Sequence, residues 1–256
     1  MKLKFVFVFL IILISTQSLS AFQIHFENLL DTRFSIKFGL TNTVLKDEYI
    51  SKEKYSDSYP FIAFGITQMW AGKINEIVLS HGNTETLANN NLDSWYEYTT
   101  LNFNLLYPIR FVPGDSNSSV IYLGPSISYY SYNFSHTFAI ASGYESEGSL
   151  LSLGISSKFI YALHPKFMIE VALSTSLVSI AEKTFDKQKY PDFEGESALT
   201  TLLETGIIDF STKFRIPVFN KFKLFLGYDL KYIRIGDWDN YNSLNNLFFV
   251  EISYDI

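Results

Sequence analysis

The sequence predicts an all-β fold, a transmembrane antiparallel up-and-down β-barrel of about ten strands within a range of eight to twelve. Apolar and polar residues alternate with a period of two through most of the 256-residue chain, which indicates strands with one apolar face. Most of these segments run for ten residues or more. Barrel strands need about 9–11 residues to cross a bilayer, whereas soluble strands usually have about five or six.

The first twenty residues have the order of an export signal. Lys2 and Lys4 form a basic start, residues 5–14 are an unbroken apolar run, and residues 15–20 are small and polar. The apolar run is too short to span a membrane, which takes about 20 residues. We therefore expect residues 1–20 to be a cleaved signal peptide and residues 21–256 to form a single barrel domain.

The first strand shows the alternation most clearly. Phe34, Ile36, Phe38 and Leu40 share one face, and polar residues occupy the other. The same analysis along the chain predicts ten strands, at about 33–42, 59–69, 74–82, 95–107, 119–132, 149–163, 167–180, 203–216, 222–235 and 247–256. Long polar connections are expected at 43–58, 83–94, 133–148, 181–202 and 236–246, and generally shorter ones between them. Short and long connections therefore lie at opposite ends of the predicted sheet.

Two architectures share this alternation: a secreted soluble sandwich or barrel with its apolar faces inside, and a membrane barrel with its apolar faces in lipid. Strand length and the alternating connections favour the membrane barrel. The 24 Phe and 17 Tyr residues favour it too, because aromatic side chains gather at membrane interfaces. Six aromatic residues near strand ends are expected to form such girdles: Tyr107, Tyr129, Tyr161, Phe167, Phe222 and Tyr254.

The last ten residues carry a resemblance to a known class of protein. Phe248, Val250, Ile252, Tyr254 and Ile256 occupy every second position, counted back from the end. This pattern resembles the terminal strand of Gram-negative outer-membrane β-barrel proteins, which usually ends in Phe where this chain has Ile256. The resemblance implies a location in the bacterial outer membrane and recognition of these five residues by the barrel-assembly machinery. It also implies outer-membrane lipid and lipopolysaccharide as surroundings, and we expect a monomer.

The polar faces of the predicted strands place charges in the lumen. Seven basic and six acidic residues have this parity: Arg33, Lys37, Lys158, Lys213, Arg215, Lys223, Lys231, Glu76, Glu170, Asp209, Asp229, Glu251 and Asp255. A selective pore favours one sign of charge, whereas balanced charges in a narrow barrel favour a self-paired polar core. We expect this structural role, with Asp229 paired to Lys213, Arg215 or Lys231.

The sequence predicts no catalytic, cofactor or metal site. The formal net charge of −6 argues against a nucleic-acid binder, and the absence of cysteine excludes disulfides and thiolate metal sites. The leading hypothesis is a non-enzymatic outer-membrane barrel with a largely filled polar lumen, acidic surface loops and a structural or surface-interaction role. A small passive channel for small solutes is one alternative. A barrel hydrolase of lipid or peptide, using His81 or His136, is the other.

Overall fold

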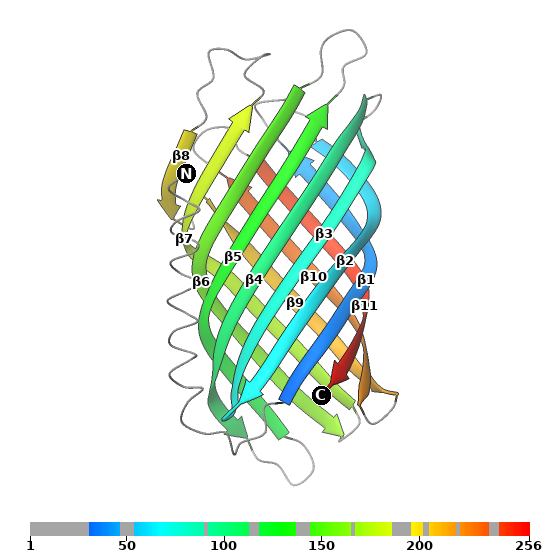
Figure 1. Ribbon diagram of the computed structural model, residues 1–256, viewed down its shortest axis with the longest axis vertical. Coiled ribbons are helices and arrows are strands. Elements are labelled where there is room, and N and C mark those ends of the chain that lie inside the picture. The colour runs from blue at the N-terminus through cyan, green and yellow to red at the C-terminus, as the bar shows by residue number, and fades with distance from the viewer. Residues whose placement is uncertain are drawn as a thin grey trace.

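The computed structural model is a barrel of long, tilted strands (Figure 1). It describes residues 31–46, 54–89, 92–112, 118–136, 144–164, 167–185, 196–201, 205–218, 221–235 and 241–256. The predicted signal peptide, residues 1–20, lies outside these ranges. In the described part of the chain, no helix is long and apolar enough to span a membrane.

Every described element is a β-strand, as the sequence predicts. The strands are β1 (Asp31–Lys46), β2 (Lys54–Trp70), β3 (Lys73–Asn89), β4 (Leu92–Val112), β5 (Ser118–His136), β6 (Tyr144–His164), β7 (Phe167–Phe185), β8 (Glu196–Thr201), β9 (Thr205–Pro217), β10 (Phe222–Ile235) and β11 (Tyr241–Asp255). All pairings are antiparallel, and β1 pairs with β11 from Arg33↔Asp255 to Lys46↔Asn242, which closes the barrel. The predicted closed up-and-down barrel is confirmed. We call the end where β1 begins and β11 ends the lower end, as it is drawn in Figure 1.

Of the eleven described strands, β8 and β9 share one position in the wall, because both pair with β7. The lower part of β7, Met168–Thr175, pairs with β9, whereas its upper part, Val178–Lys183, pairs with β8. The barrel therefore has ten positions. The predicted strand 203–216 corresponds to β9, and the prediction of a loop at 181–202 is wrong where β7 continues and where β8 forms.

The other strands also run further than predicted at the upper end. β1 continues to Lys46 and β2 begins at Lys54, so much of the predicted loop 43–58 is strand. The same correction applies to 83–94, 133–148 and 236–246, where β3, β4, β5, β6 and β11 extend into the predicted connections. The sequence predicts loops in these sections because the polarity of the two faces reverses there: apolar and aromatic residues face the lumen, and polar residues face outward. In β2, Tyr55 and Tyr59 are buried inside the barrel, while Ser56 and Ser58 are exposed.

The lower and middle parts of the wall have the expected parity. On β1, Phe34, Ile36, Phe38 and Leu40 face outward and are 44–60% exposed, while Thr41 on the inner face is fully buried. Outward apolar residues on the neighbouring strands continue this belt around the barrel, including Phe64, Leu79, Leu123, Leu173, Leu226 and Phe248. A belt of this kind is what a barrel wall presents to lipid.

A two-residue turn joins β2 to β3 at the lower end. Ala71 and Gly72 both have positive φ angles, of 49° and 77°. Hairpins of this length favour such turns because their twist matches that of the strands. Glycine adopts this conformation freely, whereas alanine is strained in it.

Candidate functional site in the barrel lumen

The lumen contains a network of ion pairs, which we call the charge network. Its members are charges that were expected in the lumen. The pairs are Arg33–Asp255, Arg33–Glu170, Lys37–Asp229, Lys158–Glu76, Lys213–Glu170, Lys213–Glu251, Lys223–Asp255 and Lys231–Asp209. Arg215, which was also expected in the lumen, lies in the lower part of β9, opposite Met168 in the register.

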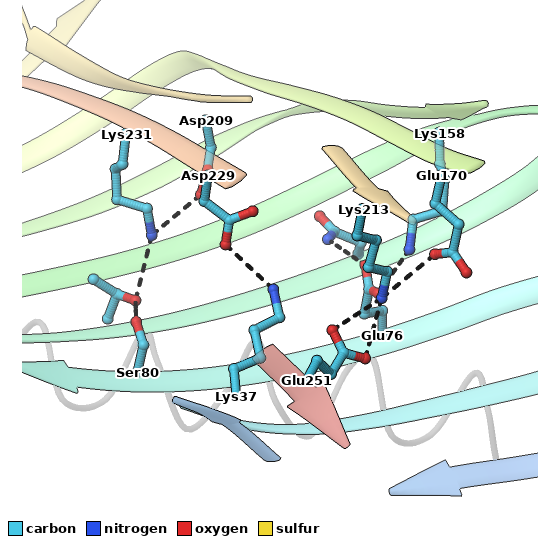
Figure 2. Close-up of polar contacts among 12 residues, drawn as sticks. Lys37, Glu76, Ser80, Lys158, Glu170, Asp209, Lys213, Asp229, Lys231 and Glu251 are labelled. Carbon is cyan, nitrogen blue, oxygen red and sulfur yellow. Dashed lines mark hydrogen bonds and ion pairs between the residues drawn. The ribbon is translucent and has the colours of Figure 1, made fainter. Parts of the chain in front are cut away.

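The lower group of the network, around Glu76, Glu170 and Glu251, includes pairs between strands that are not neighbours in the sheet (Figure 2). Lys158 of β6 donates to Glu76 Oε1 of β3 at 2.7 Å, and Asn104 donates to Oε2 of the same carboxylate at 3.2 Å. Lys213 Nζ lies 3.1 Å from Glu251 and 3.4 Å from Glu170, whose side chains are 2% and 6% exposed. These pairs therefore brace the barrel from within, where unpaired charges would be costly.

The upper group corrects one expected pairing. Asp229 Oδ2 accepts from Lys37 Nζ at 3.3 Å, and not from the predicted Lys213, Arg215 or Lys231. Lys231 instead lies 3.1 Å from Asp209 Oδ2 and 3.4 Å from the hydroxyl of Thr100 across the lumen. The expectation used sequence proximity, whereas β1 and β10 both flank β11, so their long side chains meet in front of it.

Aromatic rings support the cations of the network. Lys37 Nζ lies 4.4 Å from the ring centre of Phe249, and Lys213 Nζ lies 4.5 Å from that of Phe225. Arg33 Cζ lies 5.8 Å from the centre of the same Phe225 ring. A cation within about 6 Å of a ring is attracted to it, so these contacts hold the cations in the lumen together with the carboxylates.

A cavity of about 110 Å³ lies within the charge network, and we call it the chamber. Its lining combines nine charged residues with hydroxyl and amide groups, among them Ser80, Asn102, Ser174, Ser211 and Asn245. Two buried polar atoms of its lining residues, Asp229 Oδ1 and Asn245 Nδ2, have no hydrogen-bond partner within the described part of the protein. A polar cavity of this size holds water, which supplies the acceptor and donor that these two atoms need.

Above the chamber, the lumen is filled by aromatic side chains. Seven inward tyrosines, each at most 3% exposed, form what we call the tyrosine cluster: Tyr55, Tyr59, Tyr96, Tyr98, Tyr130, Tyr132 and Tyr241. Leu45, Leu87, Phe134, Leu150 and Ile233 are buried with them. The expectation of a polar lumen is therefore wrong for its upper part, which is filled with buried aromatic and aliphatic side chains, as the core of a water-soluble barrel is.

The rings of the tyrosine cluster cross the lumen as a continuous chain. Tyr130 stacks on Tyr132 with ring centres 5.9 Å apart, and Tyr132 stacks on Tyr241 at 4.2 Å. The hydroxyl groups of Tyr96 and Tyr130 lie 2.6 Å apart, and those of Tyr130 and Tyr241 lie 2.8 Å apart. Because Tyr241 belongs to β11 and the others to β4 and β5, these contacts join opposite walls.

Glycines make room for this cluster. A Cβ atom at Gly148 would lie 2.2 Å from the ring of Tyr132, and one at Gly82 would lie 2.7 Å from the ring of Tyr98. These rings therefore lie flat over the backbone of the neighbouring strand. The sequence shows that Tyr96, Tyr98, Tyr130 and Tyr132 occupy alternate positions, but it does not show which face they take. In the structure the polar residues between them face outward, so the tyrosines face the lumen.

Of the two histidines of the hydrolase alternative, His81 does not face the lumen. His81 is on the outward face of β3, 3.8 Å from Glu97 and 3.3 Å from the hydroxyl of Thr99. The side chain of His136 lies outside the described residues. Within the described ranges, no group of three or more His, Cys, Asp or Glu residues is arranged to hold a metal ion.

The residues of the expected assembly signal share the outward face of β11. Phe248, Ile252 and Ile256 are 64%, 45% and 66% exposed, and Val250 and Tyr254 are half-buried beside them. The aromatic residues expected in girdles also face outward. At the lower end, Phe222 contacts Tyr254 with ring centres 4.9 Å apart. Recognition of this strand by assembly machinery remains a prediction.

Comparison with solved structures places this barrel among membrane barrels. It is similar to the outer membrane protease OmpT from Escherichia coli, with a TM-score of 0.57, 8% identity, and coverage of 88% of this chain and 97% of that one. It is also similar to the translocator domain of the autotransporter NalP from Neisseria meningitidis, with a TM-score of 0.47, 12% identity, and coverage of 93% and 92%. No family model and no curated protein matches the sequence. The chain therefore has the fold of bacterial outer-membrane β-barrel proteins.

Proposed function

We propose that this protein is a non-enzymatic outer-membrane β-barrel with a closed lumen, which serves a structural or surface-interaction role. The observation that carries the proposal is the occupied lumen. Ion pairs bridge its lower and middle parts, and the tyrosine cluster fills its upper part. A ten-strand barrel is narrow enough for side chains to occupy most of its interior, so little cross-section is left for diffusion.

The outward face supports a location in the outer membrane. The apolar belt formed by residues such as Phe64, Leu226 and Phe248 would be exposed to water in a soluble protein. The fold is shared with outer-membrane proteins, and the expected signal peptide provides the route of export. The general pattern of outer-membrane barrels suggests the orientation: the lower end, with its short turns, would face the periplasm, and the longer connections would face the cell exterior.

The upper part of the wall supports a surface role. On β1, the last strongly exposed apolar residue of the belt is Leu40, and the strand continues to Lys46. Six residues at about 3.3 Å each and a tilt of about 45° raise the wall by about 14 Å. Exposed polar side chains cover this section, including Ser56, Asn83, Glu85 and Glu147. This upper section of the wall, held above the lipid surface, is suitable for contacts with other molecules.

Two measurements on the purified protein test the proposal. A folded barrel should migrate faster in an unheated detergent gel than after boiling, and reconstituted protein should add no stable current across a planar bilayer. Full recovery in the soluble periplasm, or migration that heating does not change, contradicts the membrane barrel. A large, stable current contradicts the closed lumen and favours the passive channel, the alternative that the chamber supports.

The hydrolase alternative has weaker support. OmpT is a protease, but similarity at 8% identity concerns the fold alone. His81 lies on the outside of the barrel, away from the lumen. The variant His81→Ala should therefore behave like the parent protein toward lipid and peptide substrates.

A further inference from the structure

We infer that the lumen is a one-sided, hydrated pocket: the chamber takes up water and small polar solutes from the lower end, and Tyr96, Tyr130 and Tyr241 seal it from the upper end. The inference rests on the proposed function, because it assumes a closed barrel in a membrane. To the proposed function it adds a compartment for small polar molecules, the chamber, and the three tyrosines that close it. The two closures of the chamber differ in kind.

The upper closure is made of packed rings. Tyr96, Tyr130 and Tyr241 are fully buried, and their hydroxyl groups bond to one another across the lumen. Tyr132 stacks on Tyr241 at 4.2 Å and rests over Gly148. An aromatic side chain in such packing cannot rotate without displacing its neighbours. No solute passes this layer unless several rings move together.

The lower closure is of a different kind. It contains Arg33, Lys223 and Asp255, whose side chains are 18%, 21% and 25% exposed and are joined by ion pairs, and Arg33 also lies over the ring of the buried Phe225. These pairs are more accessible to water than those of the chamber, and water that reaches a pair competes for its partners and weakens it. An apolar cluster of Ile74, Leu106 and Tyr122, with Met69, Val120 and Ile160 packed against it, lies at this end as well, along the part of the wall from β2 to β6.

The chamber between these closures has unfilled hydrogen-bonding capacity. Asn245 is 1% exposed, and its Oδ1 accepts from Thr43 at 2.6 Å, which fixes the amide with Nδ2 as the free donor. Asp229 Oδ1 is an acceptor without a partner in the described residues. Asp229 and Asn245 are diagonal neighbours on β10 and β11, since Asp229 pairs with Leu247. A molecule that both accepts and donates can bridge them, which describes water or a small alcohol or amide.

The chain has no cysteine, so a single introduced thiol is a clean reporter of access. Ser211 lines the chamber, and Ser211→Cys places a thiol there. Glu85→Cys on the exposed upper wall and Val218→Cys beside the lower end are matched controls. Each variant is reconstituted into liposomes and treated from outside with a small, membrane-impermeant cationic methanethiosulfonate. The two controls measure what fraction of molecules presents each end to the reagent.

We expect the labelled fraction of Ser211→Cys to equal that of Val218→Cys. In a background with Tyr130→Ala it should rise to the sum of the two control fractions, because both ends then admit the reagent. Labelling of the parent Ser211→Cys from the upper end overturns the seal, and labelling from neither end overturns access from below. If Tyr130→Ala does not fold, the parent measurement alone still decides both points. A large current in the bilayer assay would contradict the proposed function, whereas upper-end labelling of a barrel that carries no current would contradict only this inference.

Discussion

Removing one partner of the Lys158–Glu76 pair should destabilise the barrel, because it leaves a carboxylate in the lumen without its cation. The two side chains are 6% and 14% exposed, and Lys158 Nζ lies 2.7 Å from Glu76 Oε1. Breaking a buried pair on one side costs about 3–5 kcal/mol. Glu76 would keep the hydrogen bond from Asn104 and gain water from the chamber. We therefore expect Lys158→Met to lower the free energy of unfolding by about 3 kcal/mol, about 100-fold in the folding equilibrium.

The double variant Lys158→Met/Glu76→Leu separates this explanation from simple loss of packing. Replacing both members of a buried pair by apolar residues is often neutral, so the double variant should unfold within about 1 kcal/mol of the parent. A matched exposed pair is His81–Glu97, at 3.8 Å with side chains 41% and 33% exposed. Glu97→Ala should cost less than about 1 kcal/mol.

The assay is reversible urea unfolding in the presence of lipid vesicles, followed by tryptophan fluorescence. The explanation by an unpaired charge is refuted if the double variant is as unstable as Lys158→Met. It is also refuted if Lys158→Met unfolds within about 1 kcal/mol of the parent, because the charge network would then contribute little to stability.

Three further predictions concern other parts of the barrel. Leu226→Arg in the apolar belt should cost about 2–4 kcal/mol of folding free energy in vesicles, whereas Asn83→Arg on the upper wall should cost about 0–1 kcal/mol; equal costs would show that the belt is misplaced. Ala71→Gly should stabilise the β2–β3 turn by about 1 kcal/mol, because it relieves a positive φ angle; a lower urea midpoint would contradict this. Gly148→Val should displace Tyr132 and lower the urea midpoint, and unchanged stability would show that the cluster can rearrange.

The sequence was sufficient to predict the lower and middle barrel. In these parts, one rule decides the position of most side chains: apolar residues such as Phe38 and Leu226 face lipid, and residues such as Lys37 and Lys213 face inward. Apolar residues that are buried in the lumen, such as Phe225 and Leu106, are the exceptions. In a strictly alternating strand, once one residue is assigned to the inner or the outer face, the faces of all the others follow. The partners within the charge network could not be predicted, because they depend on which walls face one another across the lumen.

A β-bulge limits the same approach on β7. Leu153 pairs with Val178, and Gly154 pairs with Ser176, so Leu177 is an extra residue in the register. Leu177 and Val178 are therefore both exposed, and the inward parity changes from even to odd positions above them. Lys183, which is 2% exposed, lies inside the barrel for this reason. Two adjacent apolar residues within an alternating strand were the available signal, but they are also compatible with a strand that ends there.

The reversal of polarity along the wall explains why the lumen has two kinds of filling. A strand that leaves the bilayer passes from lipid to water, so its outward residues must change from apolar to polar. On β1 this change lies between Leu40, which faces outward, and Leu45, which is fully buried. Once the outer surface is polar, the inner residues supply the apolar surface that stabilises the wall. From this change of polarity we infer that the tyrosine cluster lies above the membrane and that the charge network lies in the section that lipid surrounds, where only the lumen can hold charges.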